Sequence, residues 1–166
     1  LKALGIQQTL ILTGDNSVVA KKIAQEVSIT DVHSGLLPVD KLHIIQTHSQ
    51  AGTVTGMVGD GVNDAPVLAA ADVGIALGAK GSTAASESAD VVIMLDDISR
   101  VADSVSIAKR SVMIAKQSIF IGIGLSIVLM LFASAGKIPP VYGALLQELV
   151  DVAVIINALR AHGGKI

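Results

Sequence analysis

The sequence has 166 residues, with 12 Lys and Arg, 14 Asp and Glu, and a formal net charge of −2 at pH 7. This length suits one ordinary domain, or a smaller domain with an appendage. The charge lacks the basic surplus that nucleic-acid-binding proteins carry, so nucleic acid is not an expected partner. Without cysteine, the chain forms no disulfide and no thiolate metal site. The mean hydropathy of +0.67 is high for a soluble domain.

Short β-branched runs alternate with helical patterns in the first part of the chain, as in α/β folds. The helix that ends at Val27 can be capped by Asp15 or Asn16, with Val19 and Ile23 on the same face as Val27. Residues 32–37 are expected to form an extended connection. Strands are expected at residues 9–12, 54–58, 72–77 and 91–95, with helices ending at 27, over 38–50, ending near 71 and over 82–89. The expected fold class is α/β, with a partial Rossmann-like parallel sheet.

A long apolar segment follows, and it has no charged side chain from Gln117 to Gly136. About 20 helical residues span the ~30 Å hydrocarbon core of a bilayer. The alternative, a helix buried in a large soluble core, is disfavoured because the rest of the chain is too small to enclose it. A second apolar segment runs from about Val141 to Leu159, after a link in which Pro139 and Pro140 should break the helix.

The chain is therefore expected to have three parts: an α/β domain (1–97), a helical stalk (98–116) and a transmembrane hairpin (117–160). The stalk helix should begin near Ile98 and enter the first span without a break. Basic residues precede the first span and follow the second, which favours a cytoplasmic location for both ends under the positive-inside rule. They are Lys109, Arg110, Lys116, Arg160, His162 and Lys165.

Thr13-Gly14-Asp15 follows a predicted buried strand, at the kind of strand end where open α/β sheets bind ligands. A Thr hydroxyl and a Gly amide can both donate to a phosphate oxygen, although a simple turn is an equally good interpretation. Lys41 is predicted to lie in the first turn of a helix, where the macrodipole disfavours a cation. A phosphate beside the helix N-terminus would explain it; a solvated pair with Asp40 is the alternative.

The run from Gly59 to Asp64 is the strongest signal, because it places Asp60, Asn63 and Asp64 on a glycine-rich turn after an apolar strand. The two carboxylates can converge on one site, and together they would repel unless a cation or a lysine lies between them. Such a turn can offer oxygen ligands to Mg²⁺ while a phosphoryl group approaches the backbone.

In this order, strand–Thr-Gly-Asp, the lysine after a Pro-led helix start, and Gly-Asp-Gly-x-Asn-Asp-x-Pro resemble the haloacid-dehalogenase-like phosphorylation domain of P-type ATPases. Residues 71–78 and 89–92 extend the match, and Asn157-Ala158-Leu159-Arg160 is similar to the heavy-metal branch. The resemblance implies a C-terminal part of an ATP-driven cation pump, in the plasma or inner membrane, with a cytoplasmic phosphorylation domain. It implies that Asp60 binds Mg²⁺ with support from Asp64, and that the catalytic set is Thr13, Gly14, Asp15, Lys41 and Asn63.

The family's phosphorylated aspartate lies in an Asp-Lys-Thr-Gly-Thr segment, which these 166 residues do not contain. We therefore interpret the chain as a fragment that is inactive by itself, whose partners are the N-terminal domains of the same pump, including the domain that mainly binds ATP. Two alternatives stay open: a membrane-anchored phosphatase of the same superfamily, which predicts an Asp-x-Asp absent from residues 1–12, and a non-catalytic truncated module.

Two carboxylates, Glu148 and Asp151, lie three residues apart in the second apolar segment, hence on one helical face. Ionisable groups at membrane depth are costly and usually face a pathway or a partner. They are candidate ligands for a transported divalent cation, to which Gln147 could add a carbonyl; solvation at the outer interface is the alternative. The copper, zinc and cobalt patterns of the family are not matched in full, so the metal stays open.

Overall fold

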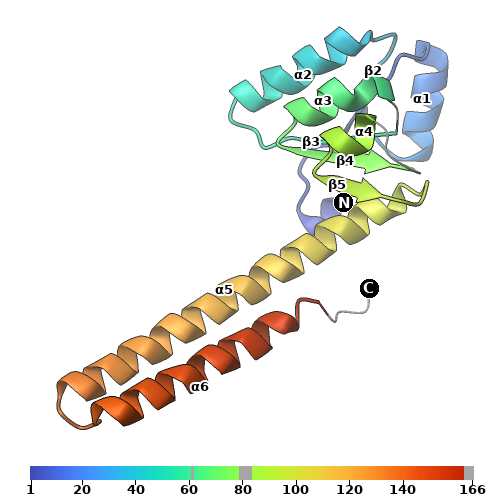
Figure 1. Ribbon diagram of the computed structural model, residues 1–166. Coiled ribbons are helices and arrows are strands. Elements are labelled where there is room, and N and C mark those ends of the chain that lie inside the picture. The colour runs from blue at the N-terminus through green and yellow to red at the C-terminus, as the bar shows by residue number, and fades with distance from the viewer. Residues whose placement is uncertain (61, 79–83, 163–166) are drawn as a thin grey trace. The chain divides into compact units, whose positions relative to one another are not determined.

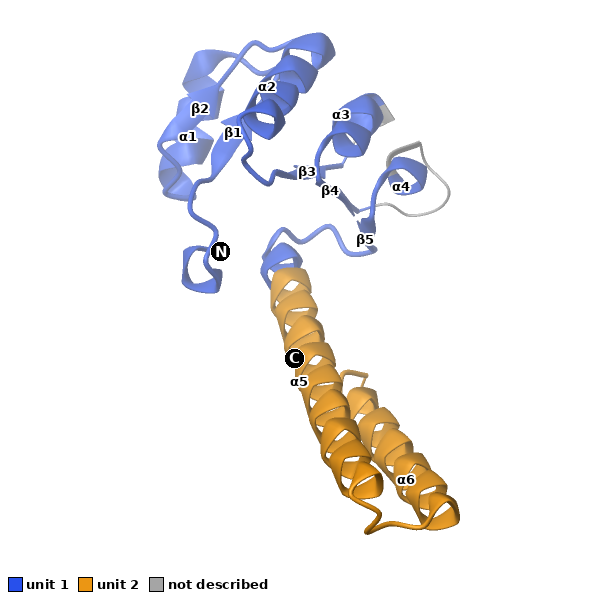
Figure 2. Ribbon diagram, turned by 90° about the vertical axis from the view of Figure 1, so that its left-hand side faces the viewer, with its two compact units in different colours: residues 1–102 blue, residues 103–166 orange. Residues whose placement is uncertain are grey.

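The computed structural model describes residues 1–60, 62–78 and 84–162. It divides into two compact units, Leu1–Ala102 and Asp103–Ile166 (Figure 2). The first unit holds the strands and the shorter helices, in the order η1 (Lys2–Leu4), β1 (Leu10–Leu12), α1 (Ser17–Glu26), β2 (Asp31–His33), α2 (Pro38–Gln50), β3 (Gly56–Gly59), η2 (Val62–Asp64), α3 (Ala65–Ala70), β4 (Val73–Leu77), α4 (Ala84–Ser88) and β5 (Val91–Ile93) (Figure 1). The second consists of most of α5 (Ser99–Ser134) and of α6 (Pro140–Leu159).

All described strand pairs are parallel, which confirms the α/β fold class. They form two groups, β1–β2 and β3–β4–β5. The strand β2 was not predicted, because Asp31 and His33 are polar and the segment resembles a connection. It pairs with β1 in the register Leu10↔Asp31. Its backbone thus supplies the hydrogen bonds that its side chains do not advertise.

The core lies on both faces of the β3–β4–β5 sheet, because neighbouring residues of β4 point to opposite sides. Ala76 packs with Met57 of β3 and with Ile45, Val67 and Leu68 of the helices α2 and α3. Ile75 faces the other way and packs with Ile93 and with Val101 in the first turns of α5. Figure 1 shows α3 and α4 on the same side of this sheet.

Asn16 caps α1, as one of the two predicted residues, and its Oδ1 accepts from the amides of Val18 (3.1 Å) and Val19 (3.0 Å). The apolar face predicted for this helix is not the buried one. Ala20 and Ala24 are buried, whereas Val19 and Ile23 are more than 40% exposed. Small residues permit close packing, so α1 approaches its neighbours through alanines and leaves the larger side chains outside.

Thr55 and Asp72 join the beginnings of β3 and β4. The Asp72 carboxylate accepts from the Thr55 amide (2.7 Å) and hydroxyl (2.9 Å). These bonds favour the ionised carboxylate, the backbone amide most, and they lower the pKa of Asp72 below its ordinary value. The pair therefore holds the two strands in register at the end opposite the Gly59 turn.

The second unit is a helical hairpin of two apolar helices. The helix α5 runs unbroken for 36 residues, as predicted, about 54 Å at 1.5 Å per residue, which exceeds the hydrocarbon thickness. The helix α6 begins at Pro140, with proline in its first turn. Both helices are long and apolar enough to cross a membrane, and nearly all of their apolar side chains lie exposed on the hairpin surface. That exposure fits a lipid environment and excludes a soluble core helix.

Candidate functional site

The turn after β1 has a compact hydrogen-bonded form. The Thr13 hydroxyl donates to Asp15 Oδ2 (3.0 Å) and accepts from the Asp15 amide (3.1 Å). The Thr13 carbonyl accepts from the Leu36 amide (3.0 Å), so the turn is tied to the segment before α2. Asp15 thus holds the threonine side chain, while the helix cap belongs to Asn16.

The start of α2 places Lys41 in its fourth position. The Leu37 amide donates to the Asp40 carboxylate (2.9 Å), which satisfies one of the free donors at the helix start. Lys41 does not pair with Asp40. Its Nζ lies 2.8 Å from Oδ1 of Asp64, and both side chains are about 15% exposed. The alternative prediction of a solvated Lys41–Asp40 pair is therefore wrong, because Asp40 is occupied by the helix start.

This ion pair connects two predicted site residues from segments 23 residues apart. Partial burial lowers the effective dielectric and strengthens the attraction. It also removes the repulsion that a second carboxylate beside Asp60 would otherwise cause. Sequence reasoning had expected either a cation or a lysine between the two aspartates, and the described residues contain the lysine.

Gly59, the last residue of β3, lets Asp64 approach the strand. A Cβ at Gly59 would lie 3.0 Å from the Asp64 Cβ and 3.2 Å from its Oδ2, closer than atoms normally pack. The pair of Gly59 and Lys41 therefore fixes Asp64 from two sides. Asp60 and Asn63 follow the strand with exposed side chains, and Gly61 between them lies outside the described residues.

The donor set suits a hard cation. Asp60 and Asp64 offer carboxylate oxygens and Asn63 an amide oxygen, and Mg²⁺ is commonly held by one or two carboxylates together with waters and phosphate oxygens. Within the described ranges no three acidic, His or Cys side chains gather. The chain alone therefore provides a partial magnesium site, not a closed cage.

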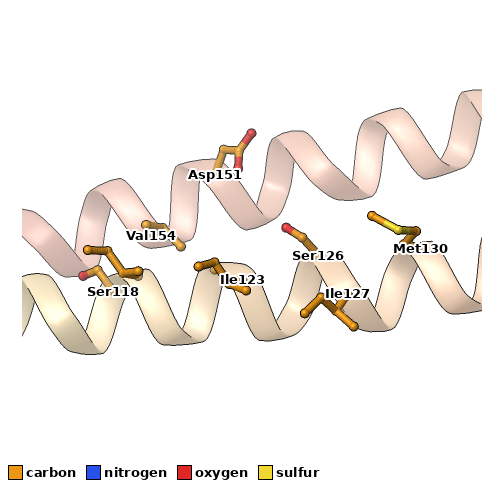
Figure 3. Close-up of a pocket in the computed structure, with 9 residues that line it drawn as sticks. Ser118, Ile123, Ser126, Ile127, Met130, Asp151 and Val154 are labelled. Atoms are coloured by element: carbon orange, nitrogen blue, oxygen red, sulfur yellow. The ribbon is translucent and has the colours of Figure 1, made fainter.

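The hairpin separates its two carboxylates. Asp151 lines a shallow groove of about 470 Å³ between α5 and α6 (Figure 3), and Glu148 does not. Asp151 Oδ1 accepts from Gln147 Nε2 (3.0 Å). The same amide nitrogen donates to Ser126 Oγ on α5 (3.0 Å), whose hydroxyl lies 3.1 Å from Gln147 Oε1.

A second polar link lies nearer the end of α6. Asn157 donates to the buried Ser118 hydroxyl (2.8 Å) and accepts from Arg160 (3.0 Å). Sequence reasoning missed Ser118 and Ser126. Their spacing with Gly122, every fourth residue in an otherwise apolar span, was the available signal, because small residues at this spacing form a close helix contact. A Cβ at Gly122 would lie 3.1 Å from Val154 of α6.

Comparison with known proteins identifies both parts of the chain. Residues 1–72 match the haloacid dehalogenase-like hydrolase family. The chain is 38% identical over 160 residues to a manganese-exporting P-type ATPase of Mycobacterium leprae, a match that covers 96% of this chain and 22% of that protein. It is 39% identical over 161 residues to a cadmium-transporting ATPase of Staphylococcus aureus, with the same two coverages.

The similarity extends to the three-dimensional structure. A crystal structure of a zinc-transporting PIB-type ATPase matches 96% of this chain and 26% of its own, with a TM-score of 0.85 and 34% sequence identity. The chain spans about a fifth of the length of the curated relatives it matches.

Proposed function

We propose, from the premise that this chain is homologous over nearly its whole length to the heavy-metal-transporting P-type ATPases, that it serves an ATP-driven pump for a divalent metal cation. Its first unit supplies the magnesium- and phosphate-binding part of the phosphorylation site. Its hairpin supplies two membrane helices of the transport pathway. The nucleophilic aspartate and most ATP contacts belong to parts of such a pump outside these 166 residues.

The observation that carries this proposal is the Lys41–Asp64 ion pair at 2.8 Å. A lysine in the first turn of a helix opposes the macrodipole, and here its charge is held beside the carboxylates of the Gly59–Asp64 turn. A fixed cation next to a magnesium site is suited to the negative charge of a transferring phosphoryl group. A purely structural turn needs neither a half-buried lysine nor a second aspartate.

The roles of the remaining residues follow from their donors and acceptors. Asp60 holds Mg²⁺ with Asp64 in support, and the bound ion would offset charge on phosphoryl oxygens. The Thr13 hydroxyl, the Gly14 amide and the Asn63 amide donate to these oxygens. The Thr13 hydroxyl now donates to Asp15, so it must turn to meet a phosphoryl oxygen.

The cargo is proposed as a class. The printed names of the relatives include manganese-exporting, zinc-exporting and cadmium-transporting ATPases, which supports a divalent metal but not one element. Glu148 and Asp151 are the proposed ligands in the hairpin. The pump is proposed to lie in the plasma or inner membrane, with the phosphorylation domain in the cytoplasm and the N-terminal domains of the same pump as its partners.

The test uses the full-length protein and phosphoenzyme formation from inorganic phosphate over a range of Mg²⁺ concentrations. Asp60→Asn should reduce the phosphoenzyme at low Mg²⁺ by at least roughly tenfold, because one of the metal's carboxylate ligands loses its charge. Asp31→Asn is the matched control, since Asp31 begins β2 and contacts Gln8 and His33. Wild-type phosphoenzyme levels in Asp60→Asn at low Mg²⁺ would remove Asp60 from the magnesium site.

A further inference from the structure

The two helices of the hairpin are joined by a side-chain network in which one amide contacts three oxygen atoms. Gln147 Nε2 donates to Ser126 Oγ on α5 and to Asp151 Oδ1 on its own helix, each at 3.0 Å. Its Oε1 lies 3.1 Å from Ser126 Oγ. Both hydrogens of the amide nitrogen and its carbonyl oxygen are therefore engaged. Figure 3 shows Ser126 directed toward α6 and Asp151 beside the same groove.

Such a network fixes a carboxylate that would otherwise be free to change rotamer. Gln147 is the only described donor to Asp151, and its own position is fixed by a serine of the other helix. Among the described residues no group donates to Oδ2, so one carboxylate oxygen is held and the other remains for a ligand. The fixed oxygen reduces the conformational freedom that cation binding would have to remove.

The neighbouring carboxylate lacks this arrangement. Glu148 is exposed, it does not line the groove, and no described residue bonds its side chain. The two acidic residues of α6 thus differ in preorganisation although they are three positions apart. A ligand that is oriented by hydrogen bonds binds a metal ion more tightly than one that must first be ordered.

We infer that Ser126 and Gln147 are positioning residues that orient Asp151 toward the transported divalent cation, and that Glu148 has no comparable support. This inference rests on the proposed function, since it takes Asp151 as a cation ligand. In this arrangement the carbonyl of Gln147 is committed to Ser126 and serves orientation rather than coordination. The network should therefore set the metal concentration that half-activates the pump and leave the maximal rate largely unchanged.

The experiment measures ATP hydrolysis by the full-length protein against the concentration of Zn²⁺, Cd²⁺ and Mn²⁺, each tested singly. Ser126→Ala and Gln147→Met should each raise the half-activating concentration of the stimulating metal roughly tenfold, with maximal turnover within about twofold. Ser126→Thr retains the hydroxyl and should restore the wild-type value. Ser134→Ala is the matched control, because Ser134 bonds only the Leu131 carbonyl of its own helix.

Asp151→Asn separates failure of the inference from failure of the proposed function. If Asp151→Asn abolishes metal stimulation while Ser126→Ala and Gln147→Met keep the wild-type metal dependence, the positioning role is refuted and the cation site stands. If Asp151→Asn keeps full stimulation, Asp151 is not a cation ligand and both fail at this residue. Phosphorylation by inorganic phosphate reports folding, and if Ser126→Ala fails there, Gln147→Met and Ser126→Thr decide by the same criteria.

Discussion

Replacing Gly59 by alanine should dislodge Asp64 from its place beside Lys41. The added Cβ would lie 3.0 Å from the Asp64 Cβ and 3.2 Å from its Oδ2, whereas unstrained carbon contacts lie at about 3.5–4.0 Å. Asp64 must therefore move by roughly 0.5–1 Å. A shift of that size takes the 2.8 Å Lys41–Asp64 contact to the limit of hydrogen-bond range. Overpacking of this kind costs about 1–3 kcal/mol.

A matched control lies in the same strand. A Cβ at Gly56 would meet its nearest neighbour, the Val73 carbonyl, at 3.9 Å, an ordinary contact. Neither glycine has a positive φ, so alanine suits both backbones. Because alanine loses less conformational entropy than glycine, Gly56→Ala should be neutral or stabilising by about 0.5–1 kcal/mol.

Hydrogen exchange of peptides from β3 and α3 reports this difference in local stability. Gly59→Ala should lower their protection roughly 5- to 150-fold, the equivalent of about 1–3 kcal/mol, and Gly56→Ala should not lower it. In the full-length protein Gly59→Ala should also require more Mg²⁺ for phosphorylation. Equal protection in both variants, or equal loss in both, would refute the steric reasoning.

Two further predictions concern the charges of the first unit. In a double-mutant cycle of Lys41→Met and Asp64→Ala, we expect a coupling free energy of about 1.5–3 kcal/mol, as for hydrogen bonds to charged groups; strictly additive losses of exchange protection would contradict the ion pair. Thr55→Val should raise the pKa of Asp72 toward its ordinary value. Because the pKa of this carboxyl is lower in the folded state, its contribution to stability is present above about pH 4 and is lost as the pH falls through the folded value. The melting-temperature difference between wild type and Thr55→Val should therefore shrink from pH 7 to pH 3, and a constant difference would contradict this.

The regular elements were largely predictable, because their signals are local. Asn16 precedes a helical pattern, Pro140 begins α6, and the uncharged run after Gln117 continues the α5 helix. The strand β2 escaped prediction because its pairing with β1 depends on backbone bonds between distant segments. Amphipathic spacing also misled at α1, where the tighter packing of alanines decided which face is buried.

The chemistry of the site was predictable as a set of residues and not as a set of contacts. The order of the three motifs singled out Lys41 and Asp64, but only the structure pairs them across 23 residues. In the hairpin, Glu148 and Asp151 had equal standing in the sequence. The partner of Gln147 is a serine on the other helix, 21 residues away, and no local pattern identifies such a partner.

The most direct test of the central claim is ATP hydrolysis by the full-length protein in proteoliposomes, with Mg²⁺ present and with Zn²⁺, Cd²⁺ and Mn²⁺ added singly. The account predicts hydrolysis that requires Mg²⁺, is stimulated by at least one of these metals and accompanies movement of that metal across the bilayer. Mg²⁺-dependent phosphatase activity without metal stimulation or metal movement would contradict it.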